Sequence, residues 1–408
     1  MLSGQGSVYR RGINKMKMIE LADNVFFCGE KDKERTMFDQ LIPLPEGTTY
    51  NSFFIKGSQK TALIDTIYPP KISILLEKLE EAGIKELDYI VSNHAEQDHS
   101  GAIPALVAKY PNVKIVTNER VKENIKSMLH VDENKFIIIQ DGETLSLGDK
   151  TLQFILAPFV HWPDTMFTYL LEDKFLFTCD FYGAHYTKGS VMADYSEDLL
   201  LSIKRYYAEI MMPFRTFACK YNKKVKEMAP KMILPSHGPV YNKPSFVIEA
   251  YEDWTSDEVK NKVIIPYVSM YESTKMMVDY LTQKLEDADI EVVLWDLIEG
   301  DNGELVMETV DAATLVIGTS MVLSGPHPAA VYCAYLLNAL KPKIKFFSIV
   351  GSYGWGGNLT KILENLLTII RPEKLDYVVI KGRPKCEDFA KLDVLANQII
   401  EKHKTIQL

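Results

Sequence analysis

The chain has 408 residues, of which 47% are hydrophobic and 25% are charged, which is the composition of a soluble globular protein. This length exceeds one ordinary hydrophobic core, so more than one domain is expected. The formal net charge of −9 argues against nucleic acid or an anionic membrane surface as the main partner. No apolar run approaches the roughly 20 residues that span a bilayer, so no membrane segment is expected.

The N-terminal residues and the cysteines indicate a cellular location. Residues 1–18 are predicted to form a flexible polar extension, because Arg10 and Arg11 are not followed by the apolar stretch of a signal peptide. The five cysteines include no CxxC pair, which excludes a rubredoxin-type or zinc-ribbon module in this sequence. Scattered cysteines are typical of a reducing cytosol, so the sequence predicts a cytoplasmic protein.

The first half of the chain alternates short strand-like runs with turns and a few helical patterns. The runs are rich in β-branched and aromatic residues and are bounded by Gly, Pro, Asp or Asn, which favours strands. Helices interspersed with hairpins predict a layered α/β fold rather than a simple βαβ array. The predicted strands are 24–29, 50–55, 61–64, 87–92, 113–117, 136–139, 152–157, 168–171 and 175–179, and the predicted helices are 71–82, 103–109 and 119–129.

A dense group of potential metal ligands follows the predicted strand 87–92. His94, Glu96, Asp98 and His99 offer two imidazoles and two carboxylates, and Gly101 then allows a tight turn into a helix. Strand ends and loops are where a rigid scaffold presents ligands. The alternative is a solvated charged loop, which the preceding apolar strand and the two histidines disfavour.

Three further potential ligands follow later apolar runs. His161 comes after the strand 152–157, and His237 comes after the apolar run 232–235 and before Gly238. Asp180 directly follows the strand 175–179, where a carboxylate beside a buried run needs a partner. Each histidine alone would more often be structural. Together with the segment 94–99, these residues predict a metal site.

The pattern becomes regular in the second half of the chain. Residues 249–262 are polar and are predicted to form a helix that links two domains. Beyond them four of the five predicted strands are followed by helical patterns, which is the signature of a doubly wound parallel sheet. The predicted strands are 263–268, 291–297, 313–319, 344–350 and 377–381, and the predicted helices are 275–287, 329–340, 359–367 and 386–401.

Three of these strands end in loops that have the character of a flavin site. Ligands of doubly wound sheets bind at the carboxyl ends of strands, and a hydroxyl-rich loop at a helix N-terminus suits a phosphate monoester. Tyr353 and Trp355 among glycines suit a flat ring better than a core, although a capped helix or a flexible turn would explain any one loop. The predicted FMN-binding residues are Ser269, Met270, Tyr271, Glu272, Ser273, Thr274, Ser320, Met321, Val322, Leu323, Ser352, Tyr353, Gly354, Trp355, Gly356 and Gly357.

The order of the metal-type residues resembles the metallo-β-lactamase superfamily. Hydrolases of that superfamily usually read His-x-His-x-Asp-His, whereas Glu96 stands here in place of the second histidine. This exchange, and the Ser-x-Tyr-x-x-Thr form of residues 269–274, are similar to the flavodiiron branch. The resemblance implies a metallo-β-lactamase-like αββα sandwich at 19–258 and a flavodoxin-like doubly wound parallel sheet at 259–408.

The resemblance also implies two iron ions and their ligands. Three carboxylates favour iron over zinc, and hence redox chemistry over hydrolysis. His185 is a competing ligand candidate, whereas His130, His327 and His403 are interpreted as structural or exposed. By resemblance, one iron would be held by His94, Glu96 and His161, the other by Asp98, His99 and His237, and Asp180 would bridge the two.

The resemblance finally implies an activity and partners. The chain is most similar overall to the coenzyme F420 oxidases of methanogenic archaea, which implies reduction of O2 to water with electrons that pass from reduced coenzyme F420 through FMN. A head-to-tail homodimer or a tetramer is implied as well. Phe38 and Asp39 stand where many relatives have a histidine, so nitric oxide reduction, or a rubredoxin or ferredoxin donor, stays open. The alternatives from other classes are a zinc metallohydrolase and an FMN electron carrier without enzymatic activity.

Overall fold

The computed structural model of the protein describes residues 17–406, so the predicted N-terminal extension lies outside the described residues except for its last two positions. The chain divides into two compact units. One contains residues up to 31, 50–156 and 168–172, and the other contains 32–49, 157–167 and 173 onward. The predicted domain boundary between residues 258 and 259 stays a prediction.

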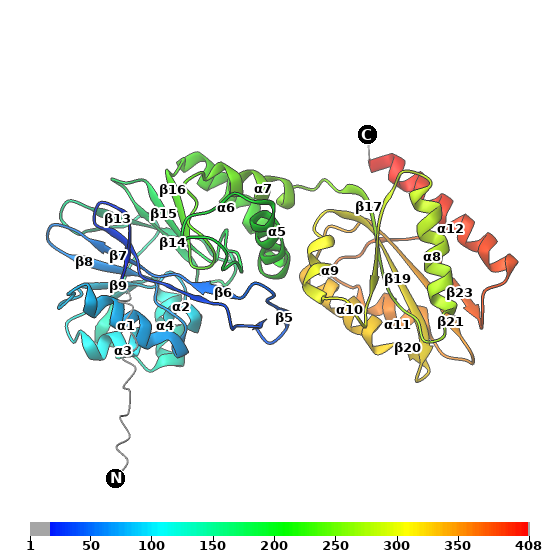
Figure 1. Ribbon diagram of the computed structural model, residues 1–408, viewed down its shortest axis with the longest axis horizontal. Helices are drawn as coiled ribbons and strands as arrows, with labels where there is room; N and C mark the ends of the chain where they lie inside the picture. The colour runs from blue at the N-terminus through cyan, green and yellow to red at the C-terminus, as the bar shows by residue number, and fades with distance from the viewer. Residues whose placement is uncertain (1–16, 407–408) are drawn as a thin grey trace, which may run out of the picture. The chain divides into compact units, whose positions relative to one another are not determined.

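A seven-stranded mixed sheet carries the first group of ligand-type residues. Its strands β1, β2, β7 and β8 pair antiparallel, and β8, β9, β10 and β11 pair parallel in that order. Helices α1 (Ile72–Glu81), α3 (Ile103–Lys109) and α4 (Glu119–Leu129) cover one face (Figure 1), where Leu75 and Ile125 are fully buried in one core. The strands are β1 (Ile19–Ala22), β2 (Val25–Phe27), β7 (Phe53–Lys56), β8 (Thr61–Ile64), β9 (Tyr89–Val91), β10 (Lys114–Thr117) and β11 (Phe136–Ile138).

A five-stranded sheet and several helical segments follow in the chain. The sheet has the order β12-β13-β14-β15-β16, and β15 pairs parallel with β16. All five residues of β15 are buried, as expected for an apolar run that ends at a site. The strands are β12 (Thr144–Ser146), β13 (Thr151–Leu156), β14 (Met166–Leu170), β15 (Phe175–Cys179) and β16 (Met232–Pro235), and the helices are α5 (Glu197–Tyr206), a π-helix (Tyr207–Met211), α6 (Arg215–Met228) and α7 (Ser245–Thr255).

The C-terminal sheet is parallel and doubly wound, as the sequence predicts. In its strand order β18-β17-β19-β21, the chain adds β18 on one side of β17 and β19 on the other. The position between β17 and β19 is therefore a topological switch point, which is where such sheets bind ligands. Helices α8 and α12 cover one face, and α9, α10 and α11 the other (Figure 1). The elements are β17 (Lys260–Val268), α8 (Ser273–Glu286), β18 (Glu291–Asp296), α9 (Asn302–Glu308), β19 (Ala312–Val322), α10 (Pro328–Leu340), β21 (Phe346–Tyr353), α11 (Leu359–Leu366), β23 (Val378–Lys381) and α12 (Cys386–Ile406).

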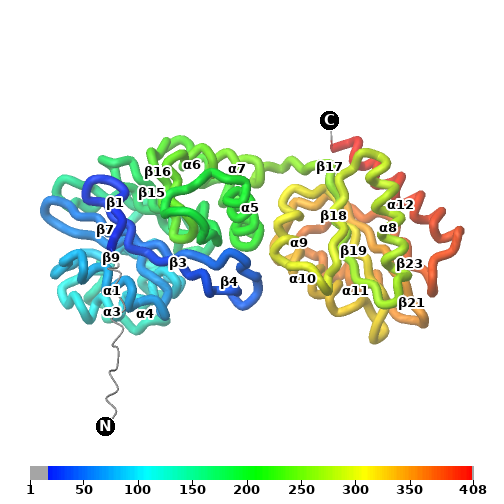
Figure 2. Tube along the Cα trace, in the orientation of Figure 1, coloured from blue at the N-terminus to red at the C-terminus, as the bar shows by residue number. Residues whose placement is uncertain are grey.

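Two predicted elements are wrong in their extent. The predicted strand 50–55 is in fact parts of two strands, because β6 (Thr48–Tyr50) ends at Tyr50 and β7 begins at Phe53. Ser52 lies between them and is buried, and its hydroxyl donates to the carbonyl oxygen of Asp65 at 2.8 Å. The predicted helix 249–262 is also wrong, since α7 ends at Thr255 and the chain then runs into β17 (Figure 2).

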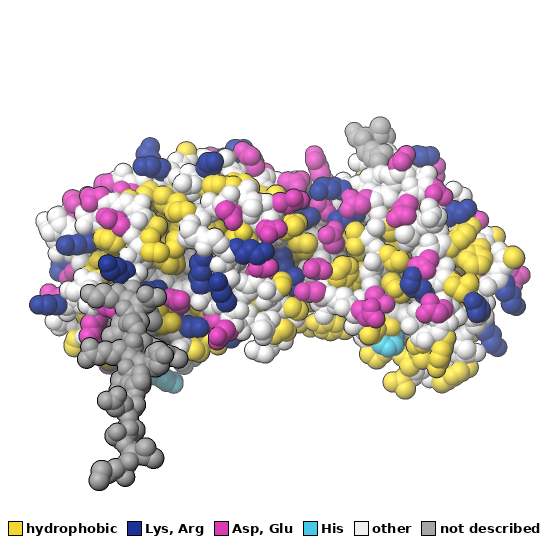
Figure 3. Space-filling model, viewed as in Figure 1, with side chains coloured by type: hydrophobic (Ala, Val, Ile, Leu, Met, Phe, Trp, Pro, Cys, Tyr) yellow, Lys and Arg dark blue, Asp and Glu magenta, His cyan; other side chains and the backbone are white. Residues whose placement is uncertain are grey.

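The distribution of charge on the surface and the apolar character of the helices bear on the expectations from composition. On the face shown in Figure 3, Lys and Arg side chains are interspersed with Asp and Glu, so neither sign dominates a large area there. Within residues 17–406, no helix combines the length and the apolar character that crossing a membrane requires.

Candidate metal centre and flavin site

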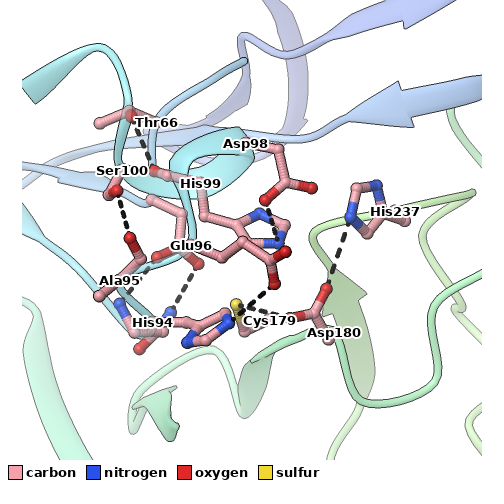
Figure 4. Close-up of polar contacts among 12 residues, drawn as sticks. Thr66, His94, Ala95, Glu96, Asp98, His99, Ser100, Cys179, Asp180 and His237 are labelled. Carbon is pink, nitrogen blue, oxygen red and sulfur yellow. Dashed lines mark hydrogen bonds and ion pairs between the residues drawn. The ribbon is translucent and has the colours of Figure 1, made fainter. Parts of the chain in front are cut away.

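The loop after β9 is fixed by hydrogen bonds from hydroxyl groups. Ser92 donates to the carbonyl oxygen of His94 at 3.0 Å, and Ser100 donates to that of Ala95 at 2.6 Å. Thr66 donates to the carbonyl oxygen of His99 at 2.7 Å (Figure 4). These hydroxyls satisfy backbone carbonyl oxygens of the loop, so they hold the backbone of the segment 94–99 in place.

The structure brings all seven predicted ligand residues together in two groups, and Figure 4 labels all of them except His161. Within each group, one ligand atom of every residue lies within 4.8 Å of one ligand atom of each of the others. The division matches the one that the resemblance implies. The first group is His94, Glu96, His161 and Asp180, and the second is Asp98, His99 and His237.

Asp180 faces both groups. Its Oδ2 lies 3.5 Å from Nε2 of His161, and its Oδ1 lies 3.4 Å from Nε2 of His237. Each carboxylate oxygen is therefore next to an imidazole of a different group, which is the placement expected of a bridging ligand. Asp180 is only 1% exposed, so its charge needs a partner in the protein interior.

The donor set fits a pair of iron ions. Four imidazoles and three carboxylates form it, and His94, His99 and His237 are almost completely buried. Three carboxylates held close together repel one another, and two bound divalent cations would offset that charge. Mixed imidazole and carboxylate ligands suit non-haem iron.

His237 is oriented by the segment before β7. Its Nδ1–H donates to the carbonyl oxygen of Thr49 at 2.6 Å, which leaves Nε2 to face Asp180. Gly238 follows with φ +80°, and its N–H donates to Oγ1 of Thr49 at 2.7 Å. A side chain at Gly238 would come within 2.9 Å of Ala184, so glycine is required in this Ser-His-Gly turn.

His185, the competing ligand candidate, lies beside His237 but outside both groups. Its Nδ1 is 2.9 Å from Oγ1 of Thr48, and its ring centre is 4.7 Å from that of Phe38. Burial, together with the nearby His237, lowers the pKa of His185 well below its usual value. A neutral, packed histidine of this kind supports the ring of His237 from the side.

The remaining histidines have the structural roles that the sequence predicts. His327 caps α10 by accepting the N–H of Ala329 at 3.1 Å. His403 is buried, with Nε2 at 2.7 Å from Oγ1 of Thr314. His130 is exposed and ends α4 in a left-handed conformation.

Tyr206 is a site residue that sequence reasoning missed. Its hydroxyl donates to Oδ1 of Asp180 at 2.9 Å, and its side chain is fully buried. It is the last residue of α5, directly before the π-helix, a feature common at functional sites. No local motif marks this contact. The hydroxyl of Tyr195, by contrast, donates to Oδ1 of Asn242 at 2.5 Å.

Removing the hydroxyl of Tyr206 should destabilise the metal-free protein. The replacement Tyr206→Phe deletes a hydrogen bond to a buried charge, which costs about 1.5–3 kcal/mol of unfolding free energy. Urea unfolding followed by circular dichroism measures the change. Tyr182→Phe is the matched control, because Tyr182 is equally buried but donates to the neutral amide oxygen of Asn222, so its loss should be about 1 kcal/mol. Equal losses would contradict a charged acceptor at Tyr206.

The predicted flavin loops meet at the carboxyl edge of the C-terminal sheet. They follow β17, β19 and β21, which are neighbours and run parallel. Ser320 pairs in register with Ser352, whose hydroxyl lies 3.1 Å from that of Thr274 at the start of α8. Hydroxyls from β19, β21 and the N-terminus of α8 thus converge, as a phosphate monoester and its sugar chain require.

This edge fits FMN in two further respects. The hydroxyl of Ser320 is buried and has no hydrogen-bond partner within residues 17–406, so it is available to a ligand. Tyr271, Leu323 and Trp355 are 84%, 87% and 70% exposed, which is unusual for such large apolar side chains unless something covers them. A flat ring system stacked on these loops would do so.

Comparison with known proteins gives one consistent picture. Residues 48–238 match the model of the ODP family beta lactamase. The chain is 34% identical to the nitric oxide reductase of Moorella thermoacetica, over 93% of this chain and 98% of the relative. It is 32% identical to a coenzyme F420H(2) oxidase of Methanocaldococcus jannaschii, over 88% of this chain and 92% of the relative.

Solved structures agree. The rubredoxin oxygen:oxidoreductase of Desulfovibrio gigas has a TM-score of 0.91 at 28% identity, covering 96% of this chain and 99% of that one. The flavodiiron protein of Giardia intestinalis shares the fold with a TM-score of 0.87 at 23% identity, covering 95% of this chain and 97% of that one. The predicted combination of a β-lactamase-like and a flavodoxin-like fold is therefore confirmed.

Proposed function

Since this chain belongs to the flavodiiron protein family, we propose that it is an oxidoreductase that reduces dioxygen to water, with reduced coenzyme F420 as electron donor. The observation that carries this proposal is the pair of donor groups that Asp180 faces with its two carboxylate oxygens. The same chain also presents the predicted flavin loops at the carboxyl edge of its C-terminal sheet. When bound, FMN and two irons would together hold the four electrons that convert one dioxygen molecule into two waters.

The roles of the residues follow from their contacts. His94, Glu96 and His161 would hold one iron, Asp98, His99 and His237 the other, and Asp180 would bridge them. The carbonyl oxygen of Thr49 sets the tautomer of His237. Tyr206 holds a proton at Oδ1 of Asp180 and is the hydroxyl best placed to deliver it into the site.

The flavin would be held by all three loops at the carboxyl edge. The hydroxyls of Ser269, Ser273 and Thr274 lie at the N-terminus of α8, where the helix dipole favours the phosphate. Ser320 and Ser352 would bond the sugar chain, and Tyr353 and Trp355 would pack against the ring. We also assign residues 19–258 to the metal domain and 259–408 to the flavin domain.

Assembly and location complete the proposal. A head-to-tail homodimer, or a tetramer built from it, would place the flavin of one subunit beside the metal pair of the other. Sedimentation of the active protein as a monomer would contradict this. The cytoplasm is the proposed location, since none of the five cysteines is paired in a disulfide.

Nitric oxide reduction is the second candidate. A relative that is 34% identical carries that name, and two nitric oxide molecules need only two of the four electrons. Phe38, whose ring centre lies 6.3 Å from that of His237, is an apolar neighbour that suits either diatomic gas. A zinc hydrolase is disfavoured because Glu96 supplies a third carboxylate.

Oxygen uptake by the purified iron- and FMN-loaded protein, with reduced coenzyme F420 as the only electron source, tests the proposal. We expect two coenzymes to be oxidised for each O2 consumed, with no peroxide detected by a peroxidase assay. No uptake with F420, but rapid uptake with reduced rubredoxin, would refute the donor alone. Uptake with neither, together with turnover of nitric oxide, would refute dioxygen as the substrate.

A further inference from the structure

Cys179 lies inside the donor cluster although no sequence motif includes it. It ends β15, directly before Asp180, and is completely buried. The pairing of β15 with β16 becomes irregular between Phe177 and Cys179, and the backbone of Cys179 has φ +51°. Its Sγ lies 3.9 Å from Oδ2 of Asp180, and Figure 4 shows the sulfur among the imidazoles and carboxylates.

Cys179 completes a third group of metal-type donors. Its sulfur and one ligand atom each of His99 and Asp180 all lie within 4.8 Å of one another. A tetrahedral zinc ion, with bonds of about 2.3 Å to sulfur and about 2.0 Å to oxygen, sets these two ligand atoms about 3.5 Å apart. The observed 3.9 Å between Sγ of Cys179 and Oδ2 of Asp180 is close to that distance.

The chemistry of this third group differs from that of the other two. A thiolate is a soft ligand that favours zinc, whereas imidazole and carboxylate ligands alone suit iron. On binding, the cysteine thiol would release its proton to solvent as the zinc–sulfur bond forms, so no oxidant or reductant is needed.

We propose that Cys179, His99 and Asp180 form an alternative zinc site whose occupation excludes the iron pair. His99 is a member of the second donor group and Asp180 of the first, so one zinc ion held by Cys179 would take a ligand from each iron. The exclusion of iron rests on the ligand roles in the proposed function. The zinc site itself does not.

Cys28 provides a matched control. It is also completely buried, but its Sγ donates to the carbonyl oxygen of Ser52 at 3.2 Å, and burial raises its pKa to about 12. Among residues 17–406, no donor group includes Cys28. A zinc ion bound through sulfur should therefore depend on Cys179 and not on Cys28.

X-ray absorption at the zinc edge tests the site directly. The full chain with FMN, stripped of metal and loaded with one equivalent of zinc, should show one sulfur neighbour at about 2.3 Å. This neighbour should be lost in Cys179→Ser and in Cys179→Ala, and retained in Cys28→Ser. Far-ultraviolet circular dichroism, which reports on both domains, confirms that each variant is folded. Only nitrogen and oxygen neighbours in the unchanged protein, or a sulfur neighbour that persists without Cys179, would overturn the proposal.

Iron uptake tests the exclusion. When ferrous iron and an equal amount of zinc are offered together, the unchanged protein and Cys28→Ser should take up at least about fivefold less iron than without zinc. Cys179→Ser should retain most of its iron under the same conditions. Equal iron loss in both cysteine variants would refute the exclusion. A sulfur-bound zinc in a protein whose iron form fails to reduce oxygen would refute the proposed function and leave the zinc site standing.

Discussion

Oxygen reduction should fall at least about 100-fold in Asp180→Asn, while FMN content stays unchanged. Asparagine keeps the size of the side chain and an acceptor for Tyr206, but it removes the charge that faces both donor groups. Replacing residues that only support a metal ligand already costs about 10–100-fold, so losing the bridge itself should cost more. The iron content per chain measures the loss of metal, and oxygen uptake measures the loss of activity. Reduction of the flavin by the donor should remain normal.

Asp311→Asn is the control for loss of a buried carboxylate. Asp311 is 3% exposed and pairs with Lys204 at 3.0 Å and Lys260 at 2.8 Å. It belongs to none of the three donor groups, so its replacement should destabilise the protein without lowering iron content. Full iron content and normal turnover in Asp180→Asn would remove Asp180 from the ligand set.

The replacement Ser273→Asp should weaken FMN binding by at least about 100-fold. Ser273 is the first residue of α8, at the place proposed for the phosphate. An aspartate there stabilises the empty helix through its dipole, so the protein should fold. The same carboxylate opposes a bound phosphate, and two unit charges 4 Å apart near a surface repel by about 4 kcal/mol. FMN content on purification, and fluorescence titration of the flavin-free protein, give the affinity.

Asn118→Asp is the control for a new charge at a helix N-terminus. Asn118 caps α4 by accepting the N–H groups of Arg120 and Val121, and aspartate caps equally well. Its FMN affinity should equal that of the unchanged protein, and iron content should be normal in both variants. An unchanged FMN affinity in Ser273→Asp would place the phosphate elsewhere.

The ligand loops could be predicted because each carries its own local signal. His94 to His99 follow an apolar strand at close spacing, and His161, Asp180 and His237 each follow another apolar run. The flavin loops follow strands of a regular parallel sheet, whose carboxyl ends necessarily share one edge. In both cases the ends of recognisable apolar strands determine where the side chains lie.

The contacts that tune the centre could not be predicted in this way. Tyr206 reaches Asp180 from 26 residues further along the chain, and the π-helix after it has no known sequence signature. The carbonyl oxygen of Thr49 bonds His237 across 188 residues. Cys179 has the sequence setting of an ordinary buried strand residue. The irregular pairing of β15 with β16 changes the direction of its side chain, and the sequence pattern of a strand does not show such an irregularity. These features depend on tertiary packing that local patterns do not encode.

The distribution of the seven metal-type residues along the chain bears on how the protein matures. They come from four separate segments between His94 and His237. His94, Glu96, Asp98 and His99 lie within six residues, whereas His161, Asp180 and His237 join them only when the chain has folded. The complete set of ligands therefore does not exist in the unfolded chain, and we expect iron insertion to follow folding. Which metal the centre then holds depends on which ions the cell supplies to the folded protein.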